Sequence, residues 1–353
     1  MSAAALDIAK AAQAASSPYI DVCGHGRVLS SELDLQEGAP PPAWLEALDQ
    51  QRQQAQEQVL KRMERGPTKQ RVVAALLRQD LQTAAQLAAQ TDDATAYKLA
   101  LRACREDAAY RSAFAARQAM PAPPAASDMA TADPPQPGAQ PTACAALTLE
   151  RMEMLGPHDA WPLLIRLSDA RSRRDEVAAG QALHQLATRS FQPRSARPLS
   201  EVLAEAVDAE PTMGESWALM MATGADMAAS FDGSPITVAR ACSPQQLVDA
   251  NRRQLCEQVV RRLPDITTEL KDARTLYVLE ERLSMPHSRQ AASQAEMLRL
   301  QEVMAEGSMS WMKAPTCANF TLAGQQVAAL ARRGELVYLH AKLNERGGAS
   351  VPR

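Results

Sequence analysis

GPHDAWPLLIRLSDARSRRDEVAAGQALHQLA, residues 156–187, has the pattern of two amphipathic helices joined by a charged turn. Gly156 and Pro157 are typical of the end of one helix, and Asp159 is placed to cap the next. Apolar residues recur at helical spacing on both sides of the polar turn at residues 173–175. Neither helix can bury its apolar stripe alone, so we expect the two to pack together as a hairpin. The predicted inner faces are formed by Trp161, Leu164, Ile165 and Leu167, and by Val177, Ala179, Leu183, Leu186 and Ala187.

This hairpin resembles a divergent tetratricopeptide (TPR) repeat, a family built from stacked helical pairs. Its turn is about two residues too long for the repeat unit of roughly 34 residues. The resemblance covers about the middle third of the chain, and it implies stacked hairpins whose concave surface binds a peptide or a partner helix. The residues near the family's usual positions are Pro157, Trp161, Leu164 and Ala179, whereas Ile165 and Ser168 replace the small and aromatic residues that the family has there.

In two other stretches, a proline is again followed by a tryptophan at the start of a predicted helix. These stretches are PPPAW at 40–44 and EPTMGESWALMM at 210–221. Trp161 and Trp217 are 56 positions apart, which does not fit one fixed period. We therefore expect irregular helical hairpins stacked as a TPR-like solenoid, a pattern also similar to bacterial helical-repeat proteins of uncharacterised function. The predicted repeat core consists of Trp161, Leu164, Ala179, Leu183 and Trp217.

Composition favours an all-α fold. Of the 353 residues, 46% are hydrophobic but only 4% are aromatic, and the apolar residues are mostly Ala and Leu. Such unbranched side chains lose little freedom in a helix, so almost no sheet is expected. The 38 basic and 41 acidic residues nearly balance, which gives no extended field for a polyphosphate and predicts no nucleic-acid partner. The sequence contains no cofactor-binding motif, so no cofactor is expected to bind.

The chain divides by composition into five parts. Residues 1–41 form a poorly periodic N-terminal segment, and residues 42–119 are helical. Residues 120–142 are rich in Pro and Ala and predict a linker or long surface loop. Residues 143–346 form the TPR-like region, and residues 347–353 form a disordered tail.

Within these parts, particular residues mark where helices begin and end. Within residues 42–119 three helices are predicted, from Pro42 to Gly66, from Thr68 through Leu87, and after a cap at Asp92 or Asp93. The stretch at 317–343 predicts a final hairpin bent at Gly334, because glycine readily takes the left-handed conformation that stops a helix.

The cellular compartment expected for the protein depends on two sequence features, a membrane-spanning segment and an export signal. No run approaches the roughly 18 apolar residues that span a bilayer, so no integral membrane segment is expected. Residues 1–17 lack the basic start and apolar core of an export signal. Taken literally, this places the protein in the cytoplasm. If the N-terminus is incomplete, the protein is periplasmic or exported.

Four of the six cysteines are candidates for two disulfides, Cys104 with Cys144 and Cys242 with Cys256. In one unbroken helix, Cys242 and Cys256 would lie roughly 20 Å apart, beyond disulfide reach. A break at Asp249 or Asn251 would let the two sulfurs meet. The alternative is that these cysteines are small buried side chains in a reduced helical core.

The remaining candidate for chemistry is Cys23 with His25, in the segment DVCGHGRV. The pair has the composition of two metal ligands, or of a reactive thiol beside a base. Two ligands do not make a metal site, and a glycine-flanked turn is the simpler interpretation.

These observations predict a non-catalytic interaction or scaffold module that binds a protein or peptide on its helical surface. Two alternatives stay open. One is a secreted or envelope structural protein stapled by disulfides, and the other is a thiol-dependent enzyme or redox protein that uses Cys23 and His25. Counting free thiols and measuring thiol reactivity would separate them.

Overall fold

The part of the chain that the structure describes is all-α apart from one small hairpin of strands, in line with the composition. The computed structural model describes residues 19–33, 43–118, 141–193, 197–228, 233–308 and 314–348, and most of them are helical. The predicted linker therefore lies outside the described residues except for its last two positions, 141 and 142. The predicted tail lies outside them except for residues 347 and 348, which belong to the last helix.

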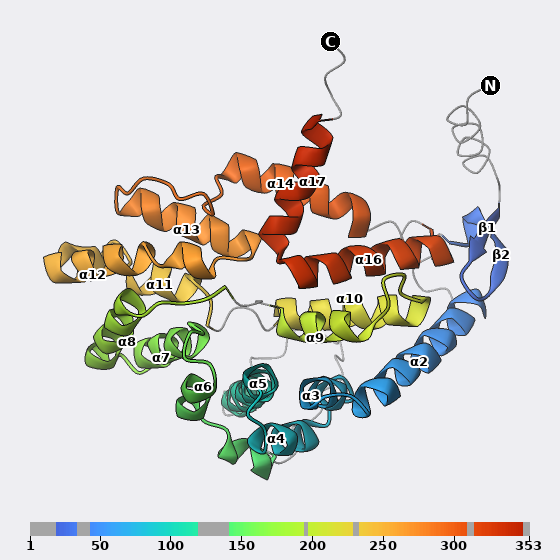
Figure 1. The fold of residues 1–353 in the computed structure, drawn as a ribbon, viewed down its shortest axis with the longest axis horizontal. Coiled ribbons are helices and arrows are strands. Elements are labelled where there is room, and N and C mark those ends of the chain that lie inside the picture. The colour runs from blue at the N-terminus through green and yellow to red at the C-terminus, as the bar shows by residue number, and fades with distance from the viewer. Residues whose placement is uncertain are drawn as a thin grey trace, which may run out of the picture.

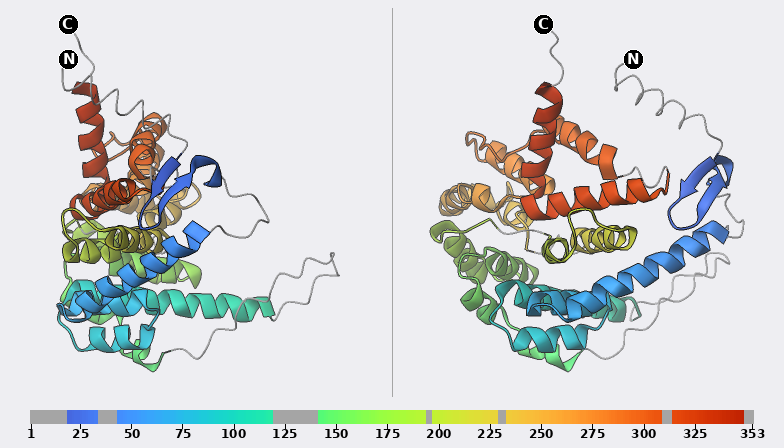
Figure 2. Two further views of the ribbon diagram at one scale, coloured as in Figure 1. Left: turned by 90° about the vertical axis from the view of Figure 1, so that its right-hand side faces the viewer. Right: turned by 45° about the vertical axis from the view of Figure 1, so that its right-hand side comes forward.

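The described part of the N-terminal segment is regular, which corrects the expectation of an irregular stretch at 1–41. Strands β1 (Tyr19–Val22) and β2 (Gly26–Leu29) pair antiparallel, and a short 3-10 turn, η1 (Ser30–Glu32), follows. The side chains of Val22 and Val28 are buried in a small apolar cluster of their own. Four-residue strands are too short to give a clear alternating pattern, so periodicity did not reveal them. The hairpin lies at one end of α2 (Ala43–Glu64), beside α16 (Cys317–Arg333) (Figure 2).

The first helical group consists of α2 (Ala43–Glu64), α3 (Thr68–Leu77), α4 (Leu81–Ala89) and α5 (Ala94–Gln118). The single helix expected from Thr68 through Leu87 is two helices, so that prediction was wrong. Gln79 adopts a left-handed φ of 61°, and the Asp80 carboxylate accepts a hydrogen bond from the Thr83 amide at 3.0 Å. This cap starts α4 in a new direction, so the apolar residues of 72–87 cover two faces.

The opening stretch forms the expected pair of helices. A 3-10 turn, η2 (Thr142–Ala146), and α6 (Leu149–Leu155) precede α7 (Trp161–Ser172) and α8 (Glu176–Thr188), and α7 packs closely on α8. Asp159 accepts a hydrogen bond from the Trp161 amide at 2.9 Å, and Asp175 accepts one from the Ala178 amide at 3.0 Å. The sequence predicted the role of Asp159, whereas it placed Asp175 only in a polar turn. Val177, however, is exposed rather than part of the inner face.

The rest of the chain wraps around α9 (Pro198–Ala206) and α10 (Met213–Ala228). These two helices lie at the centre, between α16 on one side and α3 to α5 on the other, while α2 crosses α10 (Figure 1). A second group joins α7 and α8 to α11, α12 and α13. The remaining elements are α11 (Ile236–Ala241), η3 (Gln246–Val248), α12 (Ala250–Val260), η4 (Leu263–Ile266), α13 (Leu270–Arg282), α14 (Gln294–Ser308), α16 (Cys317–Arg333) and α17 (Glu335–Gly348).

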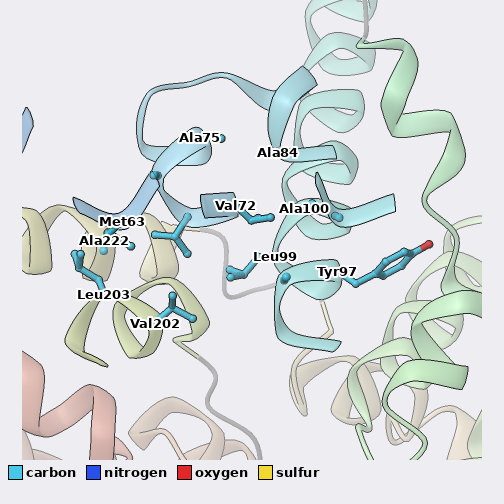
Figure 3. Close-up of a cluster of buried hydrophobic side chains, with 14 of the residues drawn as sticks. Met63, Val72, Ala75, Ala84, Tyr97, Leu99, Ala100, Val202, Leu203 and Ala222 are labelled. Atoms are coloured by element: carbon cyan, nitrogen blue, oxygen red, sulfur yellow. The ribbon is translucent and has the colours of Figure 1, made fainter. Parts of the chain in front are cut away.

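The main core is rich in alanine, which lets the helices approach closely. Figure 3 shows its centre, where Met63 lies near Leu203 and Ala222, and Val72 lies toward Leu99 and Ala100. The contact between α10 and α16 depends on Gly324. A Cβ at this position would lie 2.7 Å from Ser216 Cβ and 2.8 Å from Pro211 Cγ. Only a residue without a side chain fits at such a crossing.

Candidate functional site

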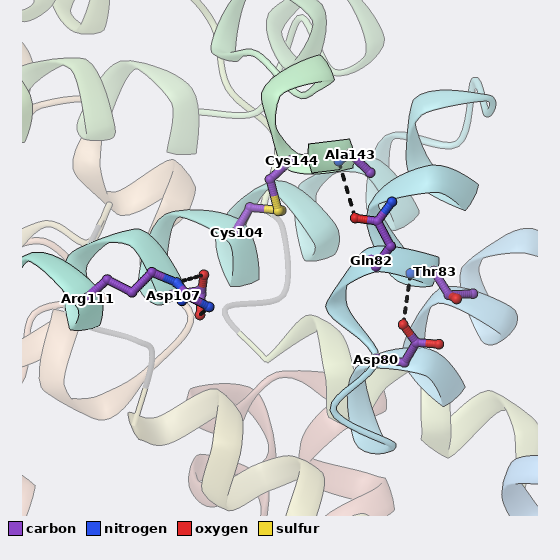
Figure 4. Close-up of a disulfide and its surroundings, with 8 residues drawn as sticks. All are labelled: Asp80, Gln82, Thr83, Cys104, Asp107, Arg111, Ala143 and Cys144. Carbon is purple, nitrogen blue, oxygen red and sulfur yellow. Dashed lines mark hydrogen bonds and ion pairs between the residues drawn. A yellow bond between two sulfur atoms is a disulfide. The ribbon is translucent and has the colours of Figure 1, made fainter. Parts of the chain in front are cut away.

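Three cysteine pairs lie at disulfide distance, so all six cysteines are paired. Cys104 of α5 joins Cys144 of η2, with the Cα atoms 5.6 Å apart. Next to this bond the Ala143 amide donates to the side-chain Oε1 of Gln82 at 3.3 Å (Figure 4). The disulfide therefore fixes the chain on the far side of residues 119–140 to the first helical group.

The second pair required the break that the sequence analysis allowed for. Cys242 and Cys256 have Cα atoms 5.9 Å apart because the chain turns at Asp249 between η3 and α12. The Asp249 carboxylate accepts the Arg252 amide at 3.0 Å and caps α12. Both cysteines are fully buried against α7 and α8.

The third pair was not anticipated. Cys23 was a candidate for chemistry with His25, but the structure joins Cys23 to Cys317 at the start of α16, with the Cα atoms 4.6 Å apart. His25 is exposed in the β1–β2 turn. Cys23 therefore has no free thiol for His25 to activate. The two cysteines are 294 residues apart, and residue spacing cannot predict a disulfide over such a separation.

The predicted repeat core is packed inside the protein. Trp161, Leu164, Ala179 and Leu183 are buried, although Trp161 belongs to the main core and the other three to the α7–α8 cluster. Trp217 is half-buried, and the Arg52 guanidinium stacks 3.9 Å above its ring. These side chains support the fold from inside and present no shared binding surface.

A buried charge cluster centres on Arg197. Its Nε donates to Glu269 Oε1 at 3.0 Å and its Nη2 donates to Glu335 Oε2 at 2.7 Å. Glu269 directly precedes α13 and also pairs with Lys271 at 2.8 Å, while Glu335 begins α17. Negative charge is favourable at a helix N-terminus, and one arginine here serves two such termini. The cluster therefore holds α9, α13 and α17 together beside a cleft of about 190 Å³.

The cluster has an unequal charge balance, because Asp272 is buried next to it. Burial and, to a smaller extent, the nearby Glu269 carboxylate raise the pKa of Asp272 to about 7, while Lys271 opposes both effects. Burial also raises the pKa of Glu335, against the effect of Arg197. Two basic side chains thus face three acidic ones, and in the folded protein Asp272 holds its proton until the pH approaches about 7.

A second cleft is lined by residues of α14, α16 and α17, the helices at the C-terminal end of the fold (Figure 1). Its volume is about 460 Å³, against about 190 Å³ beside Arg197. Gly334, with φ of 80°, turns the chain between α16 and α17 as the sequence predicts, and the groove opens in that bend. We call it the C-terminal groove; it is lined by Val303, Leu322, Gln325, Gln326, Ala329, Arg333, Tyr338, Lys342 and Arg346.

The C-terminal groove combines an apolar floor with a cationic rim. Val303 and Tyr338 are buried in the floor, and Leu322 is half exposed there. Arg333, Lys342 and Arg346 form the rim, and no carboxylate is among these described lining residues. Lys342 pairs with Glu345, whose hydrogen bond raises the pKa of Lys342, while Arg333 opposes this effect because its like charge lies nearby.

Part of this arrangement was visible in the sequence. Arg332 and Arg333 precede Gly334, where basic residues suit the C-terminal end of a helix. Lys342 and Arg346 are four positions apart and share a face of α17. The two arginines nevertheless differ in role. Arg332 turns away and donates to the Val207 carbonyl oxygen at 3.4 Å, and only packing against α9 decides this.

Among the described residues, no three His, Cys, Asp or Glu side chains gather as a metal-binding group. None of the described helices has the length and apolar character needed to cross a bilayer. Comparison with models of protein families, with curated protein sequences and with solved structures finds no match to this chain.

Proposed function

We propose that the protein is a non-catalytic interaction module that holds an acidic amphipathic helix in the C-terminal groove. The observation that carries this proposal is the groove's apolar floor beneath three cationic side chains. The resemblance of residues 156–187 to a TPR repeat supports the same class of function, with the helical pairs acting as a solenoid-like frame behind the groove.

The two parts of the groove have separate tasks in binding. Leu322, Ala329 and Tyr338 would receive apolar side chains spaced by three or four residues, and this burial supplies most of the affinity. Lys342 and Arg346 lie one helical turn apart, about 6 Å along the axis. Carboxylates spaced by four residues on a ligand helix match that interval. Because the rim is solvated, these charges mainly set orientation and association rate, and salt weakens them.

The experiment uses a fluorescent peptide that forms a helix with leucines on one face and glutamates beside them. Binding is measured by anisotropy at low and high salt. We expect Arg333→Glu combined with Lys342→Glu to weaken binding by about tenfold or more, and Leu322→Asp to weaken it at both salt concentrations. The matched control is Arg289→Glu, which reverses an exposed charge outside the groove.

Two results would contradict the proposal. One is that the acidic peptide does not bind, while a lysine version of the same peptide does. The other is that binding occurs but is equally affected by Arg289→Glu and by the double reversal in the groove.

A second candidate function has its own support. Three disulfides are typical of proteins from an oxidising compartment, because cytosolic thiols are kept reduced. We infer that the protein works in the periplasm, envelope or extracellular space, where the disulfides staple a structural component. Protein prepared from its native compartment without reductant should show no free thiol. Six free thiols in the folded protein would refute this assignment.

A further inference from the structure

The three disulfides differ in how easily a reductant can reach them. Cys317 is exposed, whereas the other five cysteines are buried, with Cys242 and Cys256 completely inaccessible. Thiol–disulfide exchange requires a thiolate to contact one of the two sulfurs, so access controls its rate. The Cys23–Cys317 bond therefore offers a reductant the most open approach.

The position of Cys317 also favours opening of this bond. Cys317 is the first residue of α16, and the Thr316 hydroxyl caps the helix by accepting the Asn319 amide at 3.2 Å. Amide groups of the first turn favour negative charge, so a thiolate released at Cys317 is stabilised where it forms.

The bond holds a small element on a large apolar surface. The Cys23 amide donates to the Pro315 carbonyl oxygen at 2.9 Å, and the Gln51 side chain donates to the Gly24 carbonyl oxygen. The hairpin contributes three buried side chains to the cluster beneath it, Val22, Cys23 and Val28. An isolated two-stranded hairpin is marginally stable at best, so it depends on what fastens it to the body.

What lies beneath the hairpin is strongly apolar. Phe320 is fully buried at the start of α16, and Trp44 and Leu48 are buried on the first turns of α2. The partly buried Trp217 and Met220 of α10 pack against the same cluster. Movement of the hairpin would expose this aromatic surface to solvent.

We propose that the Cys23–Cys317 disulfide is a reducible latch, which a dithiol opens before the other two disulfides and so releases the β1–β2 hairpin from α16. A thiolate of the dithiol attacks the Cys317 sulfur, the S–S bond breaks, and the Cys23 thiolate leaves and takes a proton. The second thiol of the reductant then displaces Cys317. The two electrons come from the dithiol, which becomes a cyclic disulfide.

The first test treats the folded, full-length protein with a limiting amount of dithiothreitol and traps new thiols with an alkylating reagent. Mass spectrometry of the peptides then identifies which cysteines have reacted. We expect Cys23 and Cys317 to be modified about tenfold faster or more than the other four. Opening of Cys104–Cys144 or Cys242–Cys256 at an equal rate would overturn the proposal.

The second test asks whether reduction releases the hairpin. Amide hydrogen exchange is compared before and after reduction, and residues 19–29 should exchange about tenfold faster or more, while residues 161–188 stay unchanged as the internal control. Cys23→Ser combined with Cys317→Ser should reproduce the change without reductant. If the double variant does not fold, the reduced wild-type protein still decides the matter. Unchanged exchange at 19–29 after confirmed reduction would refute the latch.

Discussion

Asp272→Asn is expected to stabilise the protein above neutral pH, with a gain that shrinks in acid. Asp272 is buried beside Glu269 and Glu335, and these surroundings raise its pKa from 3.8 to about 7. A carboxyl with a raised pKa holds its proton in the folded protein over a range where the unfolded chain has released it. Stability therefore falls as pH rises from 3.8 to about 7, and it is level above that range.

The size of this change in stability follows from the difference between the two pKa values. Each pH unit in this range is worth about 1.4 kcal/mol, so the buried carboxylate lowers the free energy of unfolding by about 4 kcal/mol above pH 7. Asparagine has nearly the same shape and does not ionise. Between about pH 5 and about pH 8, the free energy of unfolding of Asp272→Asn, relative to wild type, should rise by about 3 kcal/mol.

The assay is urea unfolding of wild-type and variant protein, with the disulfides intact, at about four pH values from 5 to 8. A constant offset between the two proteins reports altered hydrogen bonding, so the pH dependence of the difference is the diagnostic quantity. Asp265→Asn removes an exposed carboxylate and controls for net charge. A difference between Asp272→Asn and wild type that stays flat from pH 5 to pH 8 would refute the reasoning.

Three further predictions concern the stability of the fold. Gly324→Ala should destabilise the protein, because its Cβ meets Ser216 and Pro211, whereas Gly180→Ala in α8 has open space around it and should stabilise by up to about 1 kcal/mol; equal effects in thermal unfolding would contradict the packing. Arg197→Met should cost about 3–5 kcal/mol in urea unfolding because Glu269 and Glu335 stay buried without their shared cation. A loss below about 1 kcal/mol would show that the arginine is not needed there. Replacing Cys242 and Cys256 together with serine should cost about 3 kcal/mol, because the bond closes a short loop; an unchanged urea midpoint would show that the bond does not constrain the chain.

Local signals placed many helix boundaries correctly. Asp159 accepts the Trp161 amide at the start of α7, where the sequence predicted a cap, and Gly334 takes a positive φ where the last hairpin bends. The break at Asp249 was one of two alternatives, and the close approach of Cys242 to Cys256 selects it. The division of the expected helix into α3 and α4 at Gln79 was not predicted, because the spacing of apolar residues alone does not show a change in helix direction.

The all-α class, the helical pair at 161–188 and the caps were determined by the sequence alone, because each depends on residues within a few turns of one another. Only the tertiary structure decided the Cys23–Cys317 bond, the meeting of Arg197 with Glu269 and Glu335, and the cationic rim of the C-terminal groove. These join residues 294, 72 and 138 positions apart, or, in the groove, side chains from three helices. Such contacts depend on how the helices pack, and the spacing of residues along one helix carries no information about it.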